Sequence, residues 1–273
     1  TYMSFFSKKR FLIAEAGINH NGNIKEALKL VDAAKKTNVD AIKFQTYVTE
    51  KRTKKNSPIF AILKKCELNF KDFKVIKDYC DFKKIIFFST PFDKESVWFL
   101  QSLEVKLFKI SSFDISNYQL INEVAKTKKP TILSTGMASI KEINKAYDYF
   151  KKKKTEIALL HCISSYPNKE ETSYLSNIDY LKKKFKCEIG LSDHTNGIKV
   201  PIYAYLQGAK ILEKHFKIDI KHKCIDSPVS ITSQQFNKLI NELDKIDRIL
   251  GIPKFGIRQE ERSSEQFKRK KIL

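Results

Sequence analysis

Two histidines in the last third of the sequence, His194 and His215, stand where they could bind one metal ion together. Each comes at the end of an apolar run that predicts a β-strand, over residues 188–192 and 210–215. Neutral imidazoles at neighbouring strand ends suit a divalent transition metal. With only two strong protein ligands evident, the other coordination positions would be open to water and substrate, as in a catalytic site. The alternative is a pair of hydrogen-bonded core histidines.

Two lysines, Lys43 and Lys109, also follow apolar runs and are predicted to be buried. A buried ammonium group is costly unless it has a partner, and a phosphate or carboxylate is a natural one. Hydroxyl groups of Ser112 and Ser134 could add hydrogen bonds to such an anion. The run 134–136 precedes a predicted helix, whose backbone N–H groups favour an anion too. A Schiff-base lysine is the competing use.

Three carboxylates, Glu15, Asp193 and Glu213, are candidates for acid–base catalysis or for orienting other groups. The alternative is that they only pair with the lysines or with the metal-binding histidines. The polar turn at Asn19 and His20 could either face a substrate or cap the first helix.

The elements that position these residues alternate between short apolar runs and amphipathic stretches, which is typical of a parallel sheet. We predict strands over 11–17, 41–45, 85–90, 106–110, 131–135, 156–161, 188–192 and 210–215. Helices are predicted over 23–36, 71–82, 94–103, 119–126, 140–151, 176–185, 200–207 and 233–250. Eight strand–helix units close a (β/α)8 TIM barrel, and each strand ends in a polar group, where active sites of this fold lie. A doubly wound sheet is the rival, but no G-x-G-x-x-G follows the first strand.

Composition narrows the function classes. The 273 residues suit one large domain, and 42% hydrophobic with 30% charged residues is ordinary for a globular protein. The net charge of +21 is spread over lysines on almost every predicted helix, so we expect no nucleic-acid partner. No apolar run approaches the ~20 residues that span a bilayer, so we expect no membrane partner. Five scattered cysteines indicate reduced thiols, and a cytoplasmic location follows.

The sequence resembles the N-acetylneuraminate (sialic acid) synthase family, which includes legionaminic and pseudaminic acid synthases. The resemblance rests on short motifs in family order from about residue 11 to 250. They are IAEAGINHNG at 13–22, AIKFQT at 41–46, STPF at 89–92, FKISS at 108–112, ILSTGM at 132–137, LHC at 160–162, YP at 166–167, GLSDHT at 190–195 and EKHF at 213–216.

The resemblance implies a (β/α)8 barrel that condenses phosphoenolpyruvate with an amino sugar and needs a divalent metal, usually manganese, with magnesium or cobalt as alternatives. It implies that His194 and His215 bind the metal. Phosphoenolpyruvate would be bound by Lys43, Thr90, Lys109, Ser112, Ser134, Ser164 and Ser192. The sugar or proton transfer would be served by Glu15, Gln45, Asp114, Tyr166 and Asp226. A homodimer is implied as well.

Several departures from the family pattern lie on the sugar side. Asp114 stands where many members have glutamate, and residues 221–230 keep only Asp226 and Ser230 of the usual run. We expect a catalytic barrel over residues 1–250 and a basic linker or tail over 251–273, without the family's small C-terminal antifreeze-like domain. The acceptor would be N-acetylmannosamine or a di-acetamido hexose. Alternatives are a 3-deoxy-sugar-phosphate synthase and a catalytically silent barrel that binds phosphoenolpyruvate or a partner.

Overall fold

Eight parallel strands form the centre of the protein. The computed structural model describes residues 4–269. In it the sheet runs in the order β3-β2-β1-β8-β7-β6-β5-β4, and the two edge strands lie against each other, so that the sheet curls into a barrel. The strands are β1 (Phe11–Gly17), β2 (Ala41–Thr46), β3 (Ile86–Pro91), β4 (Phe108–Ile110), β5 (Thr131–Ser134), β6 (Ile157–Cys162), β7 (Glu188–Asp193) and β8 (Ile211–His215). The predicted (β/α)8 TIM barrel is therefore confirmed.

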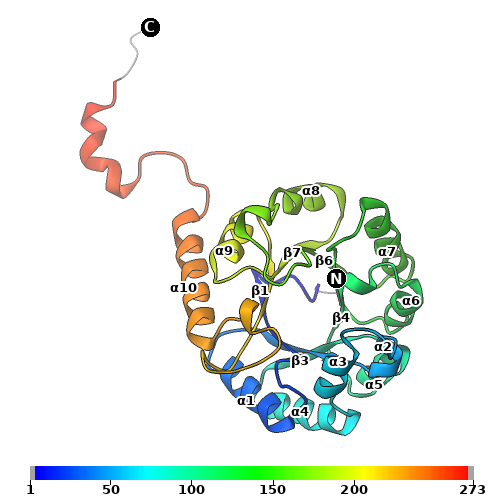
Figure 1. The fold of residues 1–273 in the computed structure, drawn as a ribbon. Coiled ribbons are helices and arrows are strands. Elements are labelled where there is room, and N and C mark those ends of the chain that lie inside the picture. Colours follow the sequence, from blue (N-terminus) through cyan, green and yellow to red (C-terminus); the bar gives the residue numbers. More distant parts are fainter. Residues whose placement is uncertain (1–3, 270–273) are drawn as a thin grey trace.

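Helices surround the strands as an outer ring (Figure 1). They are α1 (Ile24–Lys35), α2 (Thr49–Arg52), α3 (Phe60–Cys66), α4 (Phe70–Phe82), α5 (Lys94–Ser102), α6 (Tyr118–Lys126), α7 (Ile140–Lys152), α8 (Ser176–Lys184), α9 (Lys199–Leu206) and α10 (Ser233–Leu250). Side chains cap the N-termini of several of these helices. Ser139 and Glu142 form a capping box at α7, and Thr232 and Gln235 form one at α10. No helix of the described residues combines the length and apolar character needed to cross a bilayer.

Side-chain alternation along the strands divides the barrel interior into two levels. Near the amino ends of the strands, the interior is an apolar cluster made of Phe6, Phe11, Ile13, Ala41, Phe88, Leu107, Ile132, Ala158, Leu160 and Ile211. Two residues further along each strand the same inward face becomes polar, as at Glu15 after Ile13 and Glu213 after Ile211. Because successive side chains point to opposite faces of a strand, the intervening residues pack outward against the helices.

The segment between β2 and α4 contains two helices, α2 and α3, that the sequence pattern did not predict. Neither helix has a side-chain N-cap, and α2 has four residues. Tertiary contacts stabilise them: Glu67 accepts a hydrogen bond from the backbone of Thr49, and Asp93 accepts one from the backbone of Val48. Such contacts are made across the fold, which is why local sequence patterns did not reveal these helices.

The end of the chain extends away from the barrel (Figure 1). Residues 251–269 are exposed and include a 3-10 helix, η4 (Gln259–Phe267), which the sequence pattern did not predict. Residues 270–273 of the predicted tail lie outside the described residues.

Candidate active site

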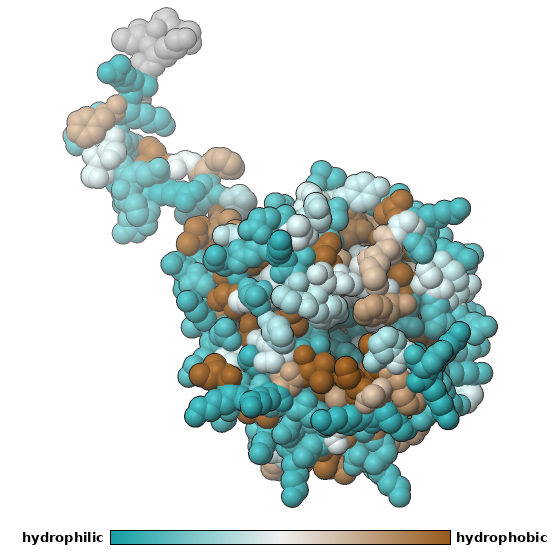
Figure 2. Space-filling model, viewed as in Figure 1, coloured by the Kyte–Doolittle hydropathy of each residue, from teal (hydrophilic) through white to brown (hydrophobic). Residues whose placement is uncertain are grey.

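A polar pocket opens at the carboxyl ends of the strands. Twelve of the sixteen predicted site residues line it: Glu15, Lys43, Gln45, Thr90, Lys109, Ser112, Ser134, Tyr166, Ser192, His194, Glu213 and His215. Figure 2 shows a mostly hydrophilic perimeter on this side of the molecule, with apolar residues around a hollow near the centre. The barrel thus brings residues from all eight strand ends into one site, as its architecture requires.

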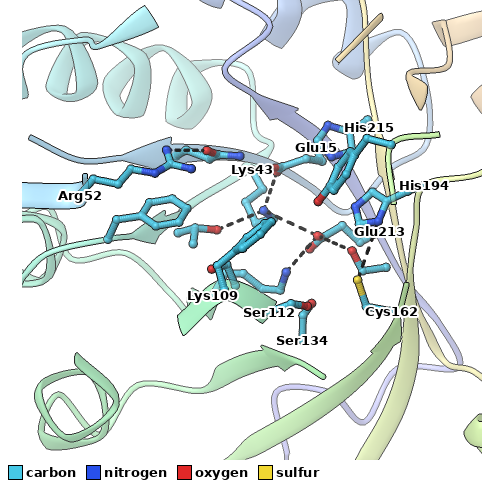
Figure 3. Close-up of a pocket in the computed structure, with 17 residues that line it drawn as sticks. Glu15, Lys43, Arg52, Lys109, Ser112, Ser134, Cys162, His194, Glu213 and His215 are labelled. Carbon is cyan, nitrogen blue, oxygen red and sulfur yellow. Dashed lines mark hydrogen bonds and ion pairs between the residues drawn. The ribbon is translucent and has the colours of Figure 1, made fainter. Parts of the chain in front are cut away.

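Two lysines and two glutamates form the floor of this pocket (Figure 3). Lys43 Nζ lies 2.6 Å from Glu15 Oε2 and 3.7 Å from Glu213 Oε1, and Lys109 Nζ lies 3.0 Å from Glu213 Oε1. No side chain of the four is more than 6% exposed. When both carboxyl groups are ionised, the charges of the four side chains sum to zero, so that each buried charge has a partner of opposite sign.

The pKa values of the two glutamates, Glu15 and Glu213, are shifted in opposite directions. Burial raises the pKa of Glu15, the negative charge of Glu213 raises it further, and Lys43 only partly offsets both. Burial acts in the same sense on Glu213, but Lys109 and Lys43 outweigh it and hold its pKa below the usual range. Carboxyl groups with such divergent pKa values are suited to different tasks, one carrying a proton and the other a permanent charge.

The two histidines lie side by side at the top of β7 and β8, with ring centroids 5.4 Å apart. His194 Nδ1 donates a hydrogen bond of 2.8 Å to the carbonyl oxygen of Ile163, so that in the neutral ring Nε2 carries the lone pair. Histidines that bind metals are typically oriented by such a bond to a carbonyl group. Burial lowers the pKa of His215, and His194 and Lys43 lower it further, which favours the neutral ring. His215 Nδ1 is buried without a hydrogen bond among the described residues, 3.5 Å from Asp226 Oδ2.

These features fit a metal held by two imidazoles with open positions. Among residues 4–269, no group of three or more His, Cys, Asp or Glu side chains is arranged to hold a metal ion. A metal here would therefore have only two strong protein ligands, and substrate or water would supply the rest.

Hydroxyl groups and one glycine line the side of the pocket near β5. The Gly136 N–H donates a 3.0 Å hydrogen bond to Ser112 Oγ, and the Ser134 hydroxyl is buried with no partner in the described structure. A Cβ atom at Gly136 would lie 2.5 Å from Ser164 Oγ and 2.8 Å from Ser112 Oγ. Ser112 and Ser164 therefore converge on a position that only glycine can occupy. Hydroxyl and ammonium groups are donors suited to an anion, and we call Ser112, Ser134, Ser164 and Lys109 together the anion cradle.

Asp193 is the correction to the predicted set, because its side chain points away from the pocket. It pairs with Lys214 at 2.5 Å and accepts hydrogen bonds from the backbone N–H and the hydroxyl of Thr195. The run 192–194 continues a strand, so its first and third side chains face the interior and the middle one faces the helices. Asp193 therefore holds Lys214 and the turn after β7, and the geometry gives it no place in the chemistry.

Three other predicted residues lie around the edge of the pocket. Ser164 belongs to the anion cradle, as described. Asp226 approaches His215, and burial raises the pKa of Asp226 to about 6. Asp114 accepts hydrogen bonds from Ser111 and Asn117 and lies on the short η1 helix (Ser112–Asp114).

Sequence reasoning missed five residues that line the pocket: Arg52, Phe92, Ser111, Phe113 and Cys162. Cys162 ends β6 facing inward, with Sγ 3.8 Å from His194 Nδ1. The period-2 alternation of β6 would have found it, because Leu160 faces the interior two residues earlier. Arg52 follows no strand directly, and no signal in the sequence marks it.

The barrel and its site define a TIM-barrel enzyme with a buried lysine–glutamate cluster beside two histidines. The chain belongs to the NeuB family, whose model matches residues 30–254. This confirms the family and the enzyme class predicted from the motifs.

Two relatives come from Campylobacter jejuni subsp. jejuni. N,N'-diacetyllegionaminic acid synthase is 35% identical over 276 residues, covering 95% of this chain and 82% of the relative. Pseudaminic acid synthase is 33% identical over 277 residues, covering 96% and 81%. Among solved structures, N-acetylneuraminic acid (sialic acid) synthetase from Leptospira borgpetersenii serovar Hardjo-bovis, in complex with citrate, is 39% identical with a TM-score of 0.90, and the match covers 95% of this chain and 91% of that one.

Proposed function

We propose that this chain condenses phosphoenolpyruvate with the open-chain aldehyde of an N-acylated amino sugar, forming a sialic-type nonulosonic acid and phosphate. The observation that carries the proposal is the buried Lys43–Glu15 and Lys109–Glu213 cluster beneath two adjacent histidines. The names of the Campylobacter relatives and of the Leptospira structure support the product class. N-acetylmannosamine and di-acetamido hexoses are the acceptors that we propose.

Phosphoenolpyruvate would lie on the floor of the pocket. Lys43 and Lys109 would neutralise its phosphate and carboxylate groups, and the hydroxyls of Thr90, Ser112, Ser134, Ser164 and Ser192 would complete its hydrogen bonds. Glu213 would hold both lysines at the level where the ligand binds, since its carboxylate contacts both of them.

The acceptor would enter above phosphoenolpyruvate, against Gln45, Tyr166 and Asp226. His194 and His215 would hold a divalent metal, manganese in the first instance with magnesium or cobalt as alternatives, and such an ion polarises the aldehyde carbonyl. Asp226 would orient His215, because its carboxylate lies 3.5 Å from Nδ1.

The electron pair of the C2–C3 double bond of phosphoenolpyruvate forms the new bond from carbon 3 to the aldehyde carbon, and the aldehyde oxygen takes up a proton. Water adds to carbon 2 and gives up one proton. Phosphate then leaves with cleavage of its bond to carbon 2 as the new hydroxyl becomes the keto group, so that the two protons of water end on the aldehyde oxygen and on phosphate. Glu15 would accept the proton of the attacking water, a task suited to a carboxyl group whose pKa burial has raised. We further propose that the enzyme is a cytoplasmic homodimer.

Phosphate release tests this proposal. The purified chain is mixed with phosphoenolpyruvate, manganese and a panel of free N-acetylated hexosamines, with and without chelator. The expected result is release that requires both a sugar and the metal. Lys109→Met should abolish it, whereas Lys210→Met, at an exposed lysine paired with Glu188, is the matched control and should not.

Other outcomes would favour the alternatives. Release with phosphorylated sugars alone would indicate a 3-deoxy-sugar-phosphate synthase. Binding of phosphoenolpyruvate without release from any sugar would indicate a silent barrel and contradict the proposed reaction.

A further inference from the structure

Arg52 places a guanidinium group at the rim of the pocket. Figure 3 shows it on the side opposite His194 and His215, with Lys43 between. It is the last residue of α2, the short helix in the segment after β2. The side chain is therefore far from the positions where a metal would be held and close to the entrance.

The guanidinium is fixed in place by aromatic rings and one hydrogen bond. Its carbon lies 3.6 Å from the centroid of the Phe92 ring and 4.6 Å from that of Tyr47. Its Nη1 donates a 3.0 Å hydrogen bond to Gln45 Oε1. Because the amide oxygen of Gln45 is occupied in this way, its NH2 group is left to donate toward the pocket.

The helix that carries Arg52 is itself held rigidly. Thr49 is bonded to Glu67, Lys51 pairs with Glu95, and Glu50 lies 3.1 Å from Lys64. A guanidinium on such a support is preorganised, so that little conformational entropy is lost when it binds a ligand.

Arg52 has no carboxylate within ion-pair distance among residues 4–269, unlike Lys43 and Lys109. Burial lowers its pKa, and the charges of Asp114 and Asp226 act on it only from a distance. A half-buried guanidinium has five N–H donors, and only one of them has a partner here. The remaining donors are satisfied best by oxygen atoms of a ligand in the pocket.

We propose that Arg52 determines acceptor specificity by donating hydrogen bonds to acyl-carbonyl or hydroxyl oxygens of an uncharged amino sugar, while holding Gln45 for the same task. This inference rests on the proposed function. A neutral acceptor is favoured over a sugar phosphate because the negative charges of Asp114 and Asp226 act on Arg52 and partly offset its positive charge.

Steady-state kinetics of Arg52→Leu and Arg52→Lys test the proposal, with KM for the acceptor, KM for phosphoenolpyruvate and kcat measured separately. Loss of a charge-assisted contact should raise the acceptor KM about 10- to 100-fold in Arg52→Leu. The KM for phosphoenolpyruvate should not change. Arg52→Lys should stay impaired, because an ammonium group cannot serve Gln45 and the ligand at once as a planar fork can.

Lys54→Leu is the matched control, since Lys54 lies two residues after Arg52 and its side chain is exposed. An unchanged acceptor KM in Arg52→Leu, or an equal rise in Lys54→Leu, would overturn the proposal. So would a wild-type preference for phosphorylated hexosamine that disappears in Arg52→Leu, because it would show an anionic acceptor.

Calorimetric binding of the acceptor to the enzyme loaded with phosphoenolpyruvate separates this proposal from the reaction itself. If the wild type binds sugar but releases no phosphate, the proposed function fails. Weaker sugar binding by Arg52→Leu would still support the role of Arg52, and equal binding would refute it.

Discussion

Removing the Glu213 carboxylate should destabilise the barrel by leaving two buried cations with one counter-ion. Glu213 Oε1 lies 3.0 Å from Lys109 Nζ and 3.7 Å from Lys43 Nζ, and also accepts a 3.1 Å bond from Ser192. Breaking a buried ion pair from one side typically costs 3–5 kcal/mol. We therefore expect Glu213→Gln to lower the free energy of unfolding by about 3 kcal/mol, which corresponds to a fall in Tm of roughly 6–12 °C.

Inorganic phosphate should reverse much of this loss. The floor of the pocket in Glu213→Gln carries one net positive charge, so phosphate should raise the Tm of this variant more than that of the wild type. Lys109→Met changes the charge in the opposite direction. The floor of the pocket in this variant carries one net negative charge, so phosphate should raise its Tm least. The double variant should lose less stability than the two single losses added together, because it leaves the pair Lys43–Glu15 intact.

Urea unfolding followed by circular dichroism, with and without phosphate, measures all three variants. An unchanged free energy of unfolding in Glu213→Gln would refute the reasoning that the four side chains form one dry, mutually compensating cluster. Equal stabilisation of Glu213→Gln and Lys109→Met by phosphate would show that the charge balance does not govern anion binding.

Four further predictions follow from the site. His194→Ala should abolish metal-dependent phosphate release with an unchanged circular dichroism spectrum, and full activity would remove this residue from the metal site. Asp193→Asn should lower Tm, because Lys214 loses its counter-ion, yet leave kcat near the wild-type value; a large loss of kcat at unchanged Tm would restore a catalytic role. Gly136→Ala should weaken phosphoenolpyruvate binding, because the new methyl group would displace Ser112 and Ser164. Calorimetry measures this affinity, and an undiminished value would argue against the anion cradle. Because the pKa of Glu213 is held below its usual value of 4.5, its stabilising contribution is full above that pH and is lost as pH falls toward the folded-state pKa. The stability gap between wild type and Glu213→Gln should therefore narrow below about pH 4.5, and a constant gap in urea titrations would contradict it.

The sequence predicted most of the fold because a parallel barrel repeats one local pattern eight times. Each strand is a short apolar run, and each helix has an amphipathic face, so both signals are present within a few residues. The helices α2 and α3 escaped detection because contacts with Glu67 and Asp93 stabilise them, and those contacts exist only once the chain has folded.

The sequence predicted those parts of the site that lie at strand ends. His194, His215, Lys43 and Lys109 each lie in a strand or directly after one and line the pocket, so their meeting follows from barrel closure. Asp193 was misassigned because residues at one strand end were treated alike, without their alternation. Arg52 could not be foreseen, since its approach to the pocket depends on how a loop folds over Phe92.

The apolar plug that fills the amino end of the barrel, with Phe6, Phe11 and Phe88 among its residues, closes the pocket at that end within residues 4–269. If phosphoenolpyruvate lies at the level of Lys43 and Lys109, as proposed, it would enter before the acceptor fills the rim beside Arg52 and Tyr166 and would leave after that rim has cleared. The order of binding would then be set by hydrophobic residues that touch neither ligand.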